Sequence, residues 1–308
     1  KVPDLCYTSP THWGKGHRAL RILLVNPKSR LPIDTRTSPS LGLAYLAAVA
    51  EQRGDQLLIH DGDVEDEPLV SAARAFAPDV IGITANTTQI VAAWRDAEML
   101  KGVLDMPIVL GGPHPTVLPE ESAAKPFVDV VVRGEGEATW LELLRCWENG
   151  HGNGGRFLDA ESEPILGITY RDADGEVVST PDRLPIPVAE LEAMPFPAWH
   201  LFKLERYTNL QPTVDQVDGP SLPILTSRGC PYRCSYCSQI GPRRWRARSA
   251  AATRRRVFPT TTATPGRDTF HRRCGHRARS RRPARGRHLA GERRVRASRP
   301  RCARHVPG

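Results

Sequence analysis

The chain has 308 residues, 40% of them hydrophobic, which is enough to build a core and excludes disorder throughout. No stretch approaches the roughly 20 uncharged apolar residues that span a membrane, and the first residues lack a basic-then-apolar signal segment. The seven cysteines do not make a disulfide scaffold at this length, and three of them share one loop, which indicates reduced thiols. We therefore expect a cytoplasmic protein without a membrane span.

The net charge of +9 is divided unevenly along the chain. Residues 253–308 contain 18 Arg, no Lys and two acidic residues, a net charge of +16, whereas the first 252 residues contain 25 basic and 32 acidic residues, a net charge of −7. The few apolar residues of the tail follow neither a helical nor a strand period, so we expect residues 252–308 to be disordered.

Two interpretations of this basic tail compete: a nucleic-acid-binding arm, and a GC-rich gene read out of frame. The absence of Lys and the abrupt start of the tail favour the second interpretation. Nucleic acid is therefore not an expected partner.

Strands and helices alternate from residue 20 onward. Short apolar runs predict buried strands at residues 21–26, 56–60, 80–84, 108–110 and 128–132. Helices are expected between them, at residues 41–52, 68–76, 89–104 and 138–147. The first of these helices is expected to start after Ser38, Pro39 and Ser40 and to end at Gly54. This alternation predicts an α/β fold with a doubly wound parallel sheet of the Rossmann-like or flavodoxin-like kind.

Ligands of such sheets bind in the loops at the carboxyl ends of the strands. Three of these loops, at residues 84–88, 111–114 and 133–137, carry small, hydroxyl or glycine residues that would let a ligand approach the backbone. Each loop taken alone is better explained by a tight turn, but the coincidence of all of them favours a binding site. No G-x-G-x-x-G follows the first strand, which argues against a dinucleotide.

The alternation of predicted strands and helices ends at about residue 150. A glycine-rich joint at residues 152–155 precedes a predicted hairpin, with strands at 165–170 and 176–180 around a turn at 172–175. Residues 181–220 are rich in proline and indicate a linker between domains. We expect the linker to pack through Phe196, Trp199, Leu201 and Phe202.

A further strand, expected at residues 222–227, leads into three closely spaced cysteines, Cys230, Cys234 and Cys237. Such spacing is improbable by chance and indicates a metal or cluster site. Three thiolates from one short loop suit a [4Fe-4S] cluster whose fourth iron is open to a ligand. Zinc is the alternative, but a closed zinc site needs a fourth ligand, such as Cys274 or His276 from the tail.

The cysteine motif, with Arg228 and Gly229 before it and Tyr236 before its last cysteine, resembles that of the radical S-adenosylmethionine (SAM) enzymes. The segments 38–46, 111–115 and 133–137 are similar to the cobalamin-binding domain of the cobalamin-dependent branch of that family. Residues 194–199 and 245–249 also resemble that branch. The resemblance covers about residues 20–251.

The resemblance implies that Cys230, Cys234 and Cys237 hold the cluster and act in catalysis, while SAM binds the fourth iron and the Tyr236 backbone contacts its adenine. Reductive cleavage of SAM then yields a 5′-deoxyadenosyl radical, and methylcobalamin donates a methyl group to an unactivated carbon of a small-molecule substrate. A one-electron reductant such as flavodoxin or ferredoxin is implied as a partner. The implied cobalamin contacts are Ser38, Leu41, Gly42, Thr84, Asn86, Thr87, Gly111, Gly112, His114, Gly134, Glu135 and Gly136.

Two departures from the family pattern matter. The D-x-H-x-x-G signature that supplies a cobalt-ligating histidine is absent, so neither His60 nor His114 is assigned as a lower ligand. A radical SAM barrel also needs roughly 200 residues of β-α units after the cysteine loop, and the recognisable sequence stops near residue 251. We therefore expect a truncated or frameshifted member that is inactive as this chain.

The expected organisation has five parts: an N-terminal extension (1–19), a cobalamin-binding α/β domain (20–150), a hairpin and linker (151–220), the start of a radical SAM barrel (221–251) and a basic tail (252–308). Two alternative functions remain open. One is a corrinoid-binding module without catalysis, and the other is a zinc- and nucleic-acid-binding protein that uses the basic tail.

Overall fold

The computed structural model describes residues 18–31, 38–148, 164–207, 222–229 and 248–249. The cysteine motif with Tyr236, most of the expected start of the barrel and the basic tail lie outside the described residues. Within the described part of the chain, no helix has both the length and the apolar character needed to cross a membrane.

A seven-stranded sheet forms the centre of the fold, in the order β2-β1-β3-β4-β5-β6-β7. The first five strands are parallel and the last two are antiparallel to their neighbours. The order 2-1-3-4-5 is that of flavodoxin-like sheets, which confirms the predicted doubly wound fold. The strands are β1 (Arg21–Asn26), β2 (Gln56–Asp61), β3 (Val80–Thr84), β4 (Ile108–Gly111), β5 (Val130–Val132), β6 (Ile168–Arg171) and β7 (Val177–Ser179).

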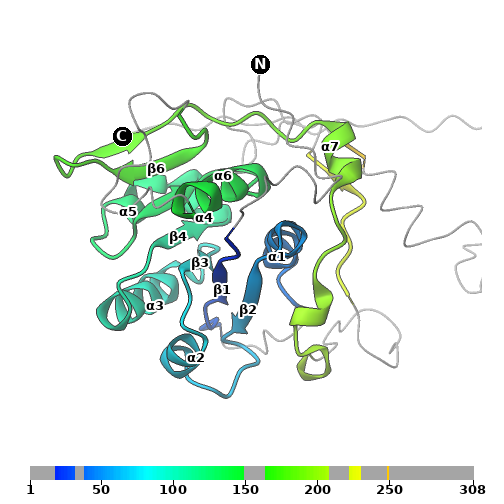
Figure 1. Cartoon of the computed structure of the whole chain (residues 1–308), viewed down its shortest axis with the longest axis horizontal. Coiled ribbons are helices and arrows are strands. Elements are labelled where there is room, and N and C mark those ends of the chain that lie inside the picture. The colour runs from blue at the N-terminus through cyan, green and yellow to red at the C-terminus, as the bar shows by residue number, and fades with distance from the viewer. Residues whose placement is uncertain (1–17, 32–37, 149–163, 208–221, 230–247, 250–308) are drawn as a thin grey trace, which may run out of the picture. The chain divides into compact units, whose positions relative to one another are not determined.

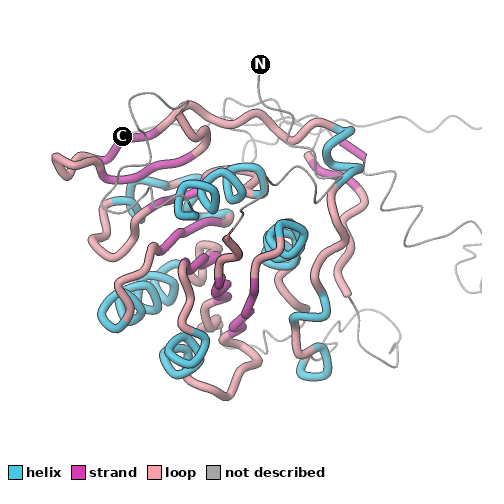
Figure 2. Tube along the Cα trace, in the orientation of Figure 1, coloured by secondary structure: helices cyan, strands magenta, loops and turns pink. Residues whose placement is uncertain are grey.

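Helices cover both faces of the sheet (Figures 1 and 2). One face packs against α1 (Leu41–Arg53) and α6 (Glu137–Glu148), and the other packs against α2 (Leu69–Phe76) and α3 (Ile90–Val103). Alternate side chains of β1 point to opposite faces, so Ile22 and Leu24 join the α1 and α6 core while Leu23 and Val25 join the other.

The ends of α1 follow the predicted signals. The hydroxyl oxygen of Ser40 caps the helix by accepting the N–H of Leu43 at 3.5 Å. Gly54 ends the helix in the left-handed region, at φ 99°. Both predictions are confirmed, and the first of them places the start of α1 at the carboxyl edge of the sheet.

Two short helices after β4, α4 (Pro113–Val117) and α5 (Pro119–Ala123), were not predicted. Each begins with a proline, which tolerates the first turn of a helix because its missing N–H has no partner there. Gly112 precedes α4 at φ 106°, and a Cβ there would lie 2.8 Å from the carbonyl oxygen of Ala85. The turn between β4 and α4 therefore requires glycine.

The predicted hairpin is confirmed and extends the same sheet beyond β5. Its turn is held by Asp172, whose Oδ1 accepts the N–H groups of Asp174 and Glu176, both at 3.0 Å. Gly175 adopts φ 84°, which suits a tight turn.

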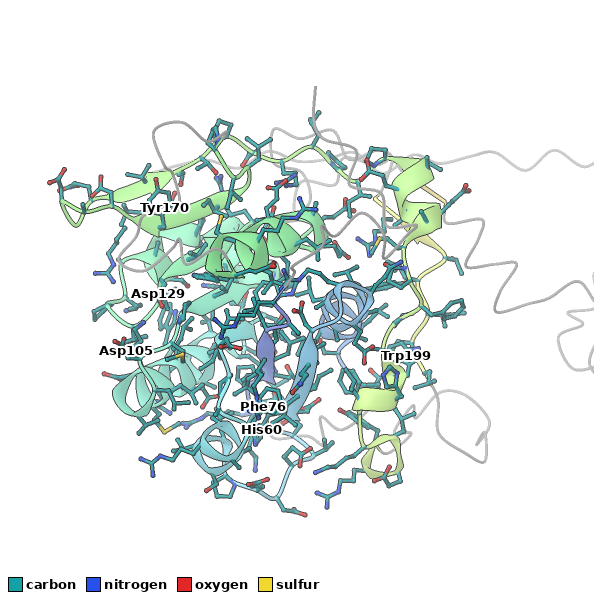
Figure 3. The ribbon with its side chains drawn as sticks, viewed as in Figure 1. His60, Phe76, Asp105, Asp129, Tyr170 and Trp199 are labelled. Atoms are coloured by element: carbon teal, nitrogen blue, oxygen red, sulfur yellow. The ribbon has the colours of Figure 1, made fainter. Side chains whose placement is uncertain are left out.

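The segment expected as a linker folds onto α1 and the sheet. We call residues 186–207 the strap; it contains α7 (Val188–Ala193) and two short 3-10 helices, η2 (Trp199–Leu201) and η3 (Leu204–Arg206). The N–H of Ala198 donates to the carbonyl of Ala44 in α1 at 2.9 Å, and Trp199, labelled in Figure 3, lies on this segment. Phe202 is buried and Trp199 and Leu201 pack against the core as expected, whereas Phe196 is exposed.

The expected strand at residues 222–227 is wrong. Only β8 (Ser227–Arg228) has strand pairing, antiparallel to β9 (Arg248–Ser249). Pro223 cannot donate a backbone hydrogen bond, and Leu222 and Ile224 are exposed rather than buried as in a core strand.

Candidate functional site

A cavity of about 450 Å³ lies between the sheet and the helices α1 and α6. The strands β1, β3, β4 and β5 supply one wall, at and near their carboxyl ends, and the first turns of α1 and α6 supply the other. Its volume is within the range of small-molecule sites, and it lies where doubly wound sheets bind their ligands.

Eight of the twelve residues that the resemblance implies as cobalamin contacts line this cavity. They are Leu41, Gly42, Thr84, Gly111, Gly112, Gly134, Glu135 and Gly136. Ser38, Asn86, Thr87 and His114 do not line it.

Three of the lining glycines leave room that protein packing does not use. A Cβ at Gly42 would meet no atom within 4 Å, and one at Gly111 or Gly136 would meet nothing closer than 3.8 Å or 3.7 Å. None of the three has a positive φ. Neither backbone strain nor a steric clash therefore requires glycine at these positions, and the lack of a side chain would let a ligand approach the backbone.

Glu135 and Gly134 are held by protein contacts. The Oε2 of Glu135 accepts the N–H of Ile186 at 2.6 Å, which attaches the start of the strap to the β5–α6 loop. The N–H of Gly134 donates to Oγ1 of Thr116 at 3.0 Å. These two residues shape the cavity more than they offer free polar groups to a ligand.

Three of the residues outside the cavity, Asn86, Thr87 and His114, make hydrogen bonds within the protein. Oδ1 of Asn86 accepts the N–H groups of Thr88 and Gln89, both at 3.0 Å, and so forms the turn before α3. The buried ring of His114 lies 3.3 Å from Oγ1 of Thr87 through Nδ1 and 3.2 Å from Oε2 of Glu121 through Nε2. Both ring nitrogens of His114 are thus engaged within the protein.

Two aromatic residues of the cavity were missing from the predicted site: Tyr45 of α1 and Trp140 of α6. Tyr45 is 8% exposed and Trp140 is 2% exposed. An apolar residue on the inner face of a helix gives the same sequence pattern whether it faces a packed core or a cavity, so periodicity could not reveal them.

A charged wall was also missed. Arg228, from β8, donates through Nη2 to Oε1 of Glu137 at 2.6 Å and lies 3.8 Å from Oε1 of Glu135 through Nη1. Its guanidinium carbon lies 5.1 Å from the ring centroid of Tyr45. We call Arg228, Glu135, Glu137 and Tyr45 the arginine clamp.

The arginine clamp is largely shielded from solvent, because the side chains of Arg228 and Glu137 are only 11% and 7% exposed. Burial acts to lower the pKa of Arg228, but the carboxylates of Glu137 and Glu135 outweigh it and raise that pKa, so the arginine stays charged. Burial also raises the pKa of the Tyr45 phenol. Oε2 of Glu137 and Nε1 of Trp140 are buried without a hydrogen-bond partner among the described residues.

The B12 binding domain family matches residues 35–144, which include α1, the first two-thirds of α6 and every strand that borders the cavity except β1. The match confirms the cobalamin-binding domain that the sequence resemblance implied for this part of the chain.

Relatives of this B12-binding-domain protein include named enzymes. An uncharacterized methyltransferase of Pyrococcus horikoshii is 35% identical over 244 residues, which cover 75% of this chain and 48% of that protein. An anaerobic magnesium-protoporphyrin IX monomethyl ester cyclase of Rubrivivax gelatinosus is 33% identical over 207 residues, covering 65% and 35%. The chain spans less than half the length of either relative.

A solved structure shares the fold. The cobalamin-dependent SAM radical enzyme OxsB, with aqua-cobalamin and SAM bound, aligns with a TM-score of 0.54 and 22% identity, covering 71% of this chain and 28% of OxsB. At this identity the likeness establishes the fold of the B12-binding domain and its neighbouring segments.

Proposed function

We propose that the cavity of this B12-binding domain takes the nucleotide tail of cobalamin, and that the chain is the cofactor-binding part of a radical SAM methyltransferase. The observation that carries the proposal is the cavity itself. Most of its lining residues lie inside the matched family region, and at three of its glycines a side-chain carbon would meet no clash.

The residues present fit such a ligand. A whole corrinoid is larger than about 450 Å³, so only its tail could enter, and the corrin ring would stay at the strand ends. The tail ends in a planar aromatic base, for which Tyr45 and Trp140 offer aromatic walls. Gly42, Gly111 and Gly136 would let the tail approach the backbone closely.

Cobalamin, when bound, supplies a methyl group carried on cobalt. Cys230, Cys234 and Cys237 have the spacing for a three-thiolate [4Fe-4S] site with one open iron, at which SAM would bind beside Tyr236. A small-molecule substrate and a one-electron reductant complete the proposed reaction. Methyl transfer is favoured over ring closure because the relative with the higher identity is named a methyltransferase.

Anaerobic reconstitution of the full chain with iron, sulfide and hydroxocobalamin tests the proposal. We expect the purified chain to retain corrinoid and the brown absorbance of a cluster. Cys234→Ala should lose the cluster and keep the corrinoid, whereas the matched control Cys146→Ala, on α6 and outside the motif, should keep both. Corrinoid without any cluster would favour a binding module without catalysis, and no corrinoid would contradict the proposal.

A further inference from the structure

Two polar groups near the start of α6 lack the hydrogen bonds that buried groups normally make. Oε2 of Glu137 and Nε1 of Trp140 are both buried, and neither has a hydrogen-bond partner among the described residues. A buried polar group without a partner is unfavourable, so most such groups in folded proteins are paired. Both side chains line the cavity, where a ligand could supply the missing partner.

The two groups are complementary and belong to neighbouring side chains. Glu137 and Trp140 are three residues apart on α6, so they are adjacent on the helix surface. A carboxylate only accepts hydrogen bonds, and an indole N–H only donates one. Arg228 donates to Oε1 of Glu137 at 2.6 Å, which leaves Oε2 for another donor. One ligand group that both accepts and donates can therefore pair with both residues.

Packing explains the ring of Trp140 but not its N–H. A Cβ at Gly82 of β3 would lie 3.4 Å from Cη2 of this ring, so the edge of the indole lies against the sheet. An apolar ring without a polar atom would fill the same place. The N–H of a buried tryptophan usually finds a hydrogen-bond partner, and here the cavity is the place from which one could come.

We propose that Glu137 and Trp140 together bind a hydroxyl group of the ribose in the cobalamin tail and select for it. The hydroxyl oxygen would accept the N–H of Trp140, and its O–H would donate to Oε2 of Glu137. Among the phosphate, ribose and base of the tail, only the ribose hydroxyls both accept and donate. In dinucleotide-binding sheets an acidic side chain likewise accepts from a ribose hydroxyl. This inference rests on the proposed function.

Calorimetric titration of the full chain with aquocobalamin and with an analogue whose ribose lacks its free hydroxyl groups tests the inference. Each lost hydrogen bond should weaken binding about fivefold, so we expect the wild-type chain to prefer aquocobalamin by about 25-fold. Trp140→Phe keeps an aromatic wall and removes one donor, so its preference should fall to about fivefold. The ratio of the two affinities cancels the lost ring area, which affects both corrinoids.

Trp147→Phe is the matched control. Trp147 is also a buried tryptophan of α6, but it does not line the cavity. Its substitution should leave the preference for aquocobalamin at the wild-type ratio. An equal fall of the preference in both variants would contradict a specific role for Trp140.

The outcomes separate this inference from the proposed function. A wild-type chain that binds both corrinoids equally, or a Trp140→Phe chain that keeps the full wild-type preference, would overturn the inference and leave the proposed function standing. A chain that binds no cobalamin would refute both. The wild-type comparison needs no variant, so it decides even where Trp140→Phe destabilises the fold.

Discussion

Two buried arginines bind carboxylates at opposite ends of the α1 and α6 pair. Arg53, at the end of α1, is fully buried and donates to both oxygens of Asp55 and to Oε2 of Glu148, each at 2.7 Å. Arg228, near the start of both helices, has one short contact to Glu137 and a longer one to Glu135. Arg53 is therefore buried within the packed core, whereas Arg228 borders a cavity.

The two ends of the α1 and α6 pair differ in whether the protein supplies partners for the buried polar groups. At the Arg53 end, Asp55 also accepts the N–H of Leu20. The Arg53 guanidinium and the Asp55 carboxylate therefore find their hydrogen-bond partners within the protein. At the Arg228 end, glycines leave space, and a carboxylate oxygen and an indole nitrogen are buried without partners among the described residues. The same ion-pair chemistry therefore stabilises the fold at one end and shapes a ligand site at the other.

The largest expected effect is on stability at the closed end. Arg53→Met leaves Asp55 buried without its forked partner, and removal of one member of a buried ion pair costs about 3–5 kcal/mol. Urea denaturation should report this loss of unfolding free energy. The control Arg18→Met breaks an ion pair with Asp79 in which Arg18 is 65% exposed, and it should cost less than about 1 kcal/mol. Equal costs for the two variants would contradict the comparison.

An intermediate effect is expected at the open end, on binding rather than stability. Gly42→Leu adds a side chain at the wall of the cavity and should weaken cobalamin binding on the order of 100-fold, or about 2.7 kcal/mol. The fold should be unharmed, because glycine is the weaker helix former. Titration calorimetry and thermal melting measure the two quantities.

Gly102→Leu is the matched control for Gly42→Leu. Gly102 also lies in a helix with open space at its Cβ position, but on α3 and away from the cavity. Its substitution should leave cobalamin affinity unchanged. A similar loss of affinity in both variants would mean that the cavity is not the binding site.

The smallest expected effect is on the pH dependence of stability and involves the carboxyl group of Asp96. Among the described residues, no arginine donates two hydrogen bonds to this group, as Arg53 does to Asp55. Burial raises the pKa of Asp96 to about 6, and the charges of His60 and Arg30 only partly oppose it. The folded protein therefore binds a proton more readily than the unfolded chain, so stability falls as pH rises from about 4 through 6. Asp96→Asn should raise stability by about 1 kcal/mol at pH 8, allowing for partial exposure, and by nothing below pH 4. Melting curves across this range check the sign, and a variant that is less stable at pH 8 would refute it.

The sequence predicted the architecture well, because a doubly wound sheet depends on local patterns. The bounds of β1 and β3 agree with the apolar runs at residues 21–26 and 80–84, and Ser40 and Gly54 mark the ends of α1. The strand at residues 222–227 failed because apolar composition alone does not provide a neighbouring strand.

The site was predicted only in part. Eight of the expected residues line the cavity, and five of them are glycines, which are visible in a sequence. Tyr45 and Trp140 carry no signal that distinguishes a cavity wall from a core. Arg228 reaches Glu137 only through the folded chain, and no local pattern links residues 91 positions apart. Asn86 and His114 lie outside the cavity and make hydrogen bonds within the protein, because polar residues at strand ends also hold turns together.

The central claim is that the cavity takes the nucleotide tail of cobalamin. Calorimetric titration of the full chain with aquocobalamin and with cobinamide, a corrinoid that lacks this tail, tests it most directly. We predict that cobinamide binds more weakly by on the order of 100-fold, the value of burying one aromatic group. Equal affinity for the two corrinoids, or no binding of either, would contradict the claim.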